Sequence, residues 1–104
     1  NVKGWKLVQN DTNLKVYTDG QSAEVYFKLS SQTLTNGTFK TIGTINSAYK
    51  PLYNIGVNGD CDSVVHSKVK IFDTGLVQGR NIHGNQQTIN FENTVVYKLA
   101  NPLY

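Results

Sequence analysis

The stretch Ala23–Leu29 (AEVYFKL) alternates between side chains that suit a protein core and side chains that suit water. Its core-type members are Ala23, Val25, Phe27 and Leu29. A period of two places these side chains on one face of a strand, whereas an amphipathic helix requires a period near 3.6. The stretch therefore predicts a β-strand with one buried face.

The rest of the chain repeats this pattern in short runs separated by clusters of Gly, Asn and Asp. Strands are expected at residues 14–17, 23–29, 38–45, 53–57, 64–72, 76–82, 89–91 and 95–99. No segment has amphipathic helical spacing over three turns, and turns at this frequency are typical of a sandwich or a barrel. We predict one all-β domain over residues 1–104, a compact antiparallel β-barrel of about six to eight short strands whose closure removes exposed edges.

Composition excludes several classes of protein. The 10 Lys+Arg and 7 Asp+Glu give a net charge of +3, and the basic residues are scattered, which argues against a nucleic-acid partner. Cys61 is the single cysteine, so no intrachain disulfide forms, and a small residue at a strand entry is favoured over a nucleophile. No signal-peptide pattern opens the given sequence, and no apolar run in it approaches the length of a membrane span. Because the chain has no Met, we expect it to be a C-terminal or internal piece of a longer protein.

The sequence offers no catalytic or metal-binding pattern. His66 and His83 lack zinc-site spacing, and no cofactor motif occurs. The carboxylates considered as a glycosidase pair are Glu24, Asp60, Asp62, Asp73 and Glu92. None is expected to form a catalytic pair: Glu24 should face solvent and Asp73 should lie in a turn, where Asp normally bonds the backbone. Asp60 and Asp62 flank Cys61 in a loop, where either contact with a ligand or exposure to water is open. The sequence therefore predicts a protein that is not an enzyme and has no cofactor or metal.

Polar side chains gather on the predicted hairpin on either side of Asp73-Thr74-Gly75. On one strand they are His66, Lys68 and Lys70, and on the other Gln78 and Arg80, with His83 near its end. Exposed side chains of paired strands lie side by side, and grouped donors of this kind suit hydroxyl-rich or phosphate-bearing ligands. The alternative is an ordinary solvated sheet face.

Two further features bear on the fold. Pro51, in Tyr49-Lys50-Pro51, predicts a strand entry, an edge or a bend, because proline cannot donate to a ladder, and Tyr49 is expected to anchor this corner. Trp5 is the single tryptophan, and packing in a core or an interface is favoured over a sugar-stacking platform.

The order of motifs resembles a known family. A Trp near the start is followed by a strand ending in Asp19-Gly20, the long alternating strand, T-I-G-T-I-x-x-x-Y-K-P over residues 41–51, an Asn-Gly loop and a strand ending in D-T-G. This order resembles the C-terminal head domains of receptor-binding baseplate proteins from siphophages of the lactococcal type. Relatives commonly carry Arg at the position of Lys50 and, in some cases, a tryptophan-rich strand where this chain has residues 76–80.

The resemblance implies a function and partners. It implies a homotrimeric head at the tail tip of a virion that binds a host cell-wall saccharide without cleaving it, joined to other baseplate proteins through a preceding segment. It places saccharide binding at Lys68, Lys70 and Arg80, to which the polar-face argument adds His66 and His83. An apolar inter-subunit face is expected from Trp5, Leu7, Leu52 and Tyr53. The alternative is a trimerising baseplate or tail module without a ligand of its own.

Overall fold

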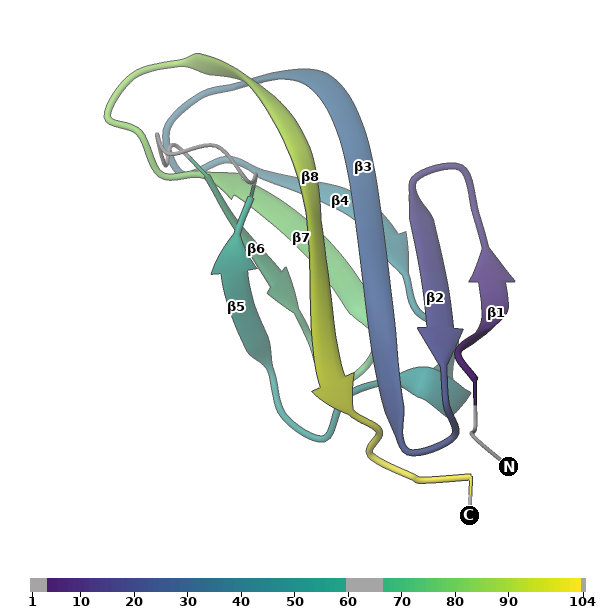
Figure 1. Cartoon of the computed structure of the whole chain (residues 1–104). Coiled ribbons are helices and arrows are strands. Elements are labelled where there is room, and N and C mark those ends of the chain that lie inside the picture. Colours follow the sequence, from purple (N-terminus) through teal and green to yellow (C-terminus); the bar gives the residue numbers. More distant parts are fainter. Residues whose placement is uncertain (1–3, 60–66, 104) are drawn as a thin grey trace.

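The computed structural model describes residues 4–59 and 67–103, which form eight strands and one short 3-10 helix. The elements are β1 (Lys6–Asn10), β2 (Leu14–Thr18), β3 (Ser22–Leu34), β4 (Phe39–Thr44), η1 (Ser47–Tyr49), β5 (Ile55–Asn58), β6 (Ser67–Ile71), β7 (Leu76–Asn81) and β8 (Gln87–Lys98). They build two antiparallel four-stranded sheets, with strand orders β1-β2-β3-β8 and β4-β7-β6-β5 (Figure 1). The all-β prediction is confirmed.

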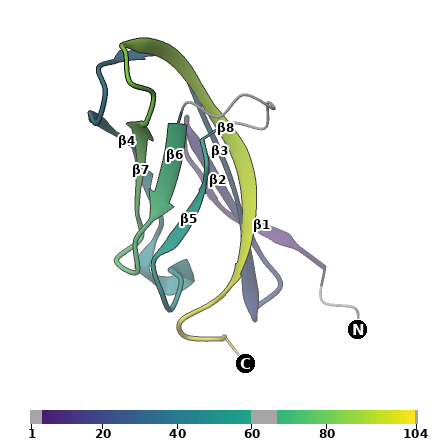
Figure 2. The same cartoon turned by 90° about the vertical axis from the view of Figure 1, so that its left-hand side faces the viewer.

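The core lies between the two sheets, which Figure 2 shows as two facing layers. Both sheets contribute to it in alternation, as period two requires. In β3 the core residues Ala23, Val25 and Phe27 are fully buried. Phe91 of β8 is equally buried, as are Val69 of β6 and Val77 of β7 from the second sheet.

The predicted barrel is not closed. Where β5 faces β8, single contacts replace a ladder: the Glu92 N–H donates to the Gly59 carbonyl at 2.8 Å, and Pro51 makes one bridge with Leu99. Where β1 faces β4, the Gln9 amide spans the gap, because its Nε2 donates to the Thr44 carbonyl at 2.8 Å and its Oε1 accepts from the Asn46 N–H at 2.7 Å. The fold is therefore a sandwich of two sheets, joined at their edges by individual hydrogen bonds.

A bulge in β3 explains why the sequence alternation stops at Leu29 although the strand runs on to Leu34. The register with β8 shifts between Leu29 and Gln32, and Ser31 has a positive φ of 57°. The Ser31 N–H donates to Oδ1 of Asn90 on β8 at 2.7 Å. In a regular strand, residues five positions apart face opposite sides, so Leu34 would not share the core face of Leu29. The extra residue of the bulge reverses the facing of every later side chain, and Leu34 is therefore buried. Beyond the bulge β3 and β8 curve over together, at the top of Figure 1.

Two strand assignments from the sequence were wrong. β1 was not predicted, because its burial is slight and its own register shifts between Leu7 and Gln9, which hides the alternation. The predicted strands 89–91 and 95–99 are parts of the single strand β8. Polar Asn93 separates the two apolar runs in the sequence. In the structure it lies on the edge strand β8, directly opposite Phe27 of β3, and its Nδ2 donates to the Asn58 carbonyl at 3.2 Å.

The Tyr-Lys-Pro corner is tied to the end of β8. Asn46 caps η1 by accepting the Ala48 N–H at 2.9 Å, and buried Pro51 bridges Leu99. The Tyr97 hydroxyl donates to the Tyr49 carbonyl at 2.6 Å, and burial raises the pKa of that phenol. Tyr49 thus anchors the corner through its backbone, with Tyr97 supplying the side chain.

Two turns differ in what they connect. The predicted hairpin of β6 and β7 is confirmed, and it closes through the Gly75 N–H donating to the Phe72 carbonyl at 2.9 Å. The Asn36-Gly37 dipeptide is of a kind that favours tight hairpins. In the structure it instead carries the chain from β3 in one sheet to β4 in the other. Gly37 fits this crossover because its φ is +79° and its N–H donates to the Asn81 carbonyl at 2.8 Å.

The turn between β2 and β3 is held by Asp19. Its carboxylate Oδ1 accepts the backbone N–H groups of Ser22 at 2.8 Å and Gln21 at 2.9 Å. These hydrogen bonds, that from Ser22 foremost, lower the pKa of Asp19, because they stabilise its charged form. Gly20 beside it has a φ of 95°, a conformation that favours glycine.

Candidate functional site

The outer face of the second sheet carries the polar side chains predicted from the hairpin. Along β6 the burial alternates: Lys68 and Lys70 face solvent, whereas the core-facing positions are Ser67, Val69 and Ile71. Along β7 the same alternation leaves Gln78 and Arg80 outward. The predicted residues Lys68, Lys70 and Arg80 therefore lie on one face of one sheet.

Strand register arranges this face into two rows that cross all four strands. The first row runs Phe39, Arg80, Lys68 and Asn58 from β4 to β5. The second row, displaced by two residues along each strand, runs Thr41, Gln78, Lys70 and Gly56. Directly opposite residues have Cβ atoms about 4.5–5.5 Å apart, so each row is a contiguous strip of side chains.

A groove of about 500 Å³ follows these rows. Its side chains include Phe39, Phe72, Lys68, Lys70, Gln78 and Arg80. Gly56 opens one side of the groove, because a Cβ added there would meet no atom within 4 Å. We call this surface the sheet groove.

Each cation in the sheet groove is placed by a neighbouring group. The Lys70 ammonium lies 4.8 Å from the centroid of the Phe72 ring, and the Arg80 guanidinium carbon lies 5.4 Å from that of Phe39. Both distances fall in the range of cation–π attraction. The Lys68 ammonium donates to Oδ1 of Asn58 at 2.8 Å, which leaves two of its three N–H groups for other partners.

No carboxylate balances these charges among the described groove-lining residues, none of which is Asp or Glu. Within residues 4–59 and 67–103, Lys68, Lys70 and Arg80 have no ion pair. The sheet groove is therefore a positively charged concave surface with two aromatic rings in its wall.

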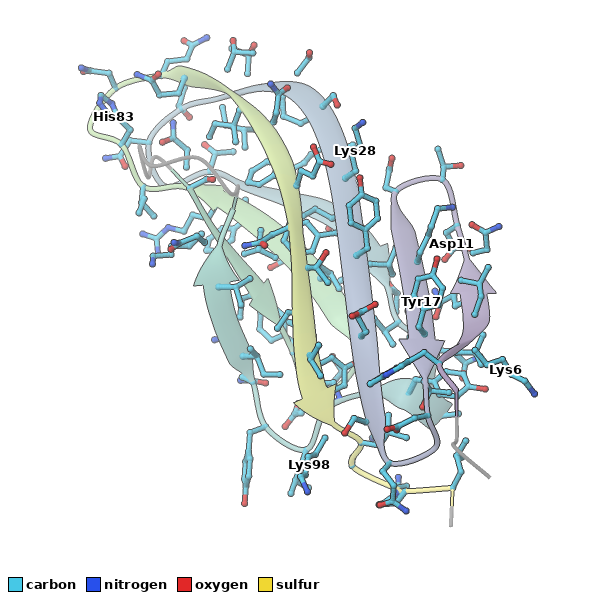
Figure 3. All side chains as sticks on the ribbon, in the orientation of Figure 1. Lys6, Asp11, Tyr17, Lys28, His83 and Lys98 are labelled. Atoms are coloured by element: carbon cyan, nitrogen blue, oxygen red, sulfur yellow. The ribbon has the colours of Figure 1, made fainter. Side chains whose placement is uncertain are left out.

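Of the two predicted histidines, the structure describes His83, and it does not join this cluster. His66 lies outside the described residues. His83 lies in the loop after β7, at the upper left of Figure 3, and is not among the groove-lining residues. Its N–H donates to Asn81 Oδ1 at 2.7 Å and its Nδ1 accepts the Asn85 N–H at 3.1 Å, so it belongs to the hydrogen bonding of its own loop.

The aromatic part of the site was missed from the sequence. Residues 76–80 contain no aromatic side chain, but Phe39 from β4 and the Phe72 that follows β6 supply two rings. Phe72 lies two residues after Lys70, so strand alternation could have predicted its ring on the same face as Lys70. The sequence gives no comparable indication for Phe39, because its place beside Arg80 depends on the pairing of β4 with β7, which follows the crossover between the sheets.

Other chemistry has little support in the part of the chain that the structure describes. No group of three or more His, Cys, Asp or Glu residues there is placed to hold a metal ion. Of the carboxylates considered as a glycosidase pair, Glu92 accepts a hydrogen bond from the Tyr26 hydroxyl at 2.6 Å. Asp60 and Asp62 fall outside the described ranges, as does Cys61. None of the described helices has the length and apolar character of a membrane span.

Comparison with protein-family models, with curated proteins and with solved structures gives no match for this chain. A functional assignment must therefore come from the chemistry of the site. The sheet groove is the surface on which donors, cations and aromatic rings meet.

Proposed function

We propose that this domain binds a host cell-wall saccharide without cleaving it, as the head of a phage receptor-binding protein at the tail tip. The observation that carries the proposal is the sheet groove, in which cationic and amide donors line the same hollow as two phenyl rings. The motif order described above supports the phage setting. Other baseplate proteins would then be its partners through a preceding segment.

The composition of the sheet groove suits a sugar. Hydroxyl groups accept hydrogen bonds from Lys, Arg and amide donors, while the C–H face of a sugar ring packs against an aromatic ring. A volume of about 500 Å³ is within the range of small-molecule sites. Phe39 is 56% exposed, so its ring is accessible to a ligand.

Binding is favoured over hydrolysis by the lining of the sheet groove. Glycosidases generally use two carboxyl groups that flank the scissile bond. The described lining residues supply none. A weak single site would still give firm attachment if several copies engaged one wall at once.

Titration of the domain with isolated cell-wall polysaccharide tests this function. We expect saturable binding without release of reducing ends. A Lys70→Ala/Gln78→Ala variant should bind at least about tenfold more weakly, because the charge-assisted hydrogen bond of Lys70 contributes about 1.5–3 kcal/mol and the neutral one of Gln78 about 0.5–1.5 kcal/mol. Lys28→Ala is the matched control, since Lys28 is exposed on the outer face of the other sheet (Figure 3). Absence of binding to any wall polysaccharide, or release of reducing ends, would contradict the proposal.

A trimerising structural module is the second candidate, favoured by exposed apolar side chains. Trp5, Leu7, Leu52 and Tyr53 are 47%, 43%, 55% and 75% exposed. Trp5 thus does not belong to the core, and of its two remaining roles, interface packing and sugar stacking, the trimer proposal uses the first. Leu52 and Tyr53 also border an apolar hollow of about 320 Å³ beside Tyr97.

Light scattering at micromolar concentration tests this candidate. We expect a trimer, and a shift to monomer for Leu52→Ser/Tyr53→Ser, because the apolar area that drives association is removed. Val96→Ser is the control, as Val96 is 56% exposed on the outer face of the first sheet. A trimer that binds no polysaccharide would favour the structural role, and a monomeric wild-type domain would exclude it.

A further inference from the structure

Lys68 and Arg80 stand directly opposite each other on the paired strands β6 and β7. Like charges at directly opposite positions destabilise a sheet. On the first sheet the chain avoids this arrangement, since Lys28 of β3 stands opposite Glu92 of β8. The Lys68–Arg80 pair is therefore a local cost to the fold that needs a reason.

The described neighbours of the pair hold both cations in place but carry no charge that neutralises them. Asn58 accepts one N–H of the Lys68 ammonium at 2.8 Å, and the ring of Phe39 faces the Arg80 guanidinium at 5.4 Å. Lys70 adds a third positive charge in the next row. A preorganised set of cations with no carboxylate among the described lining residues is suited to an anion that arrives from outside.

We infer that Lys68 and Arg80 form a clamp for an anionic group, phosphoryl or carboxyl, carried by the saccharide. The planar Arg guanidinium presents paired N–H donors that match two oxygens of such a group, and the two remaining N–H groups of Lys68 can bind the same group. Lys70 supplies additional positive charge. This inference rests on the proposed function for the source of the anion, but the clamp itself is a property of the two opposed side chains.

The clamp has a signature that a purely structural role lacks. Neutralising one member relieves the like-charge repulsion, so Lys68→Gln should be more stable than the wild type when no anion is present. The same change should weaken anion binding. A residue that only supported the fold would lose stability on substitution, and an ordinary solvated lysine would change neither property.

Thermal unfolding at low ionic strength, with inorganic phosphate, glycerol 3-phosphate, glucuronate or neutral glycerol added, tests the inference. We expect the phosphates or glucuronate to raise the Tm of the wild type, and glycerol to have no effect. A larger shift with glycerol 3-phosphate assigns a phosphoryl group, and a larger shift with glucuronate a carboxyl group. High salt should abolish the response, because exposed charges are screened.

Three variants make the test decisive. Lys68→Gln and Arg80→Gln should each raise the Tm without anion by about 1–5 °C and bind anions roughly tenfold more weakly. Lys68→Arg should keep the anion response. Lys6→Gln on β1 removes the same charge far from the sheet groove and should change neither property (Figure 3). An anion response in Lys68→Gln and Arg80→Gln equal to that of the wild type would overturn the clamp.

The two proposals fail in distinguishable ways. Equal affinity for wall polysaccharide before and after chemical removal of its acidic groups would overturn the clamp and leave saccharide binding intact. Anion binding that depends on Lys68 and Arg80, without affinity for any wall polysaccharide, would support the clamp and contradict the proposed function.

Discussion

Replacing Gly79 with valine is expected to lower the free energy of unfolding by about 3 kcal/mol or more, and Gly79→Ala by about 1–3 kcal/mol. Gly79 lies in the middle of β7 with its missing side chain directed at the core. A Cβ there would lie 2.5, 2.6 and 2.8 Å from three ring atoms of Phe91. Phe91 belongs to β8 in the opposite sheet and is fully buried, so its ring has no free space into which to move.

Urea unfolding measures this effect, with Gly56→Val as the matched control. Gly56 is also a strand glycine of the second sheet, but a Cβ there meets no atom within 4 Å, so we expect a change within about 0.5 kcal/mol. Gly79→Ala combined with Phe91→Leu should cost less than the sum of the single variants, because the smaller side chain makes room for the methyl group. Additive costs, or equal costs for Gly56→Val and Gly79→Val, would show that close packing of Phe91 on Gly79 does not hold the sheets together.

Gly75→Ala is expected to cost about 2–4 kcal/mol, for two separate reasons. Gly75 has a φ of +97°, which L-residues with a Cβ rarely adopt. A Cβ would also lie 2.4 Å from the Ile45 carbonyl oxygen, a backbone atom that cannot rotate away. That backbone is itself held to the turn, since the Ile45 N–H donates to the Gly75 carbonyl at 2.7 Å.

Gly37→Ala separates the two reasons in the same unfolding assay. Gly37 has a φ of +79° but no atom within 4 Å of an added Cβ, so only the conformational cost of about 1–2 kcal/mol should appear. The difference between the two variants measures the contact with Ile45. If Gly75→Ala cost no more than Gly37→Ala, the packing of this turn against the β4–η1 connection would not matter for stability.

Much of the candidate site could be predicted from local sequence. The alternation along β6 places Lys68 and Lys70 outward, and the Asp73-Thr74-Gly75 turn predicts that β7 pairs with β6. Arg80 then follows onto the same face. These inferences hold because strand facing and tight turns depend on residues close together in the chain.

Other parts of the site could not be predicted, since they depend on contacts between distant segments. His83 continues the polar pattern beyond Arg80, yet the loop after β7 turns it away into bonds with Asn81 and Asn85. Phe39 reaches Arg80 because Asn36-Gly37 serves as a crossover between sheets where its composition predicts a hairpin. No short window of sequence distinguishes these outcomes.

The sequence by itself determined the strand class, the alternation of β3 up to Leu29 and the shared face of Lys68, Lys70 and Arg80, because a period of two is a local steric property. Only the tertiary structure decided that the strands divide into two sheets, that Phe91 fills the space left by Gly79, and that Phe39 lies beside Arg80. Those outcomes depend on which distant strands pair and in what register, and that choice is made by the packing of one whole sheet on the other.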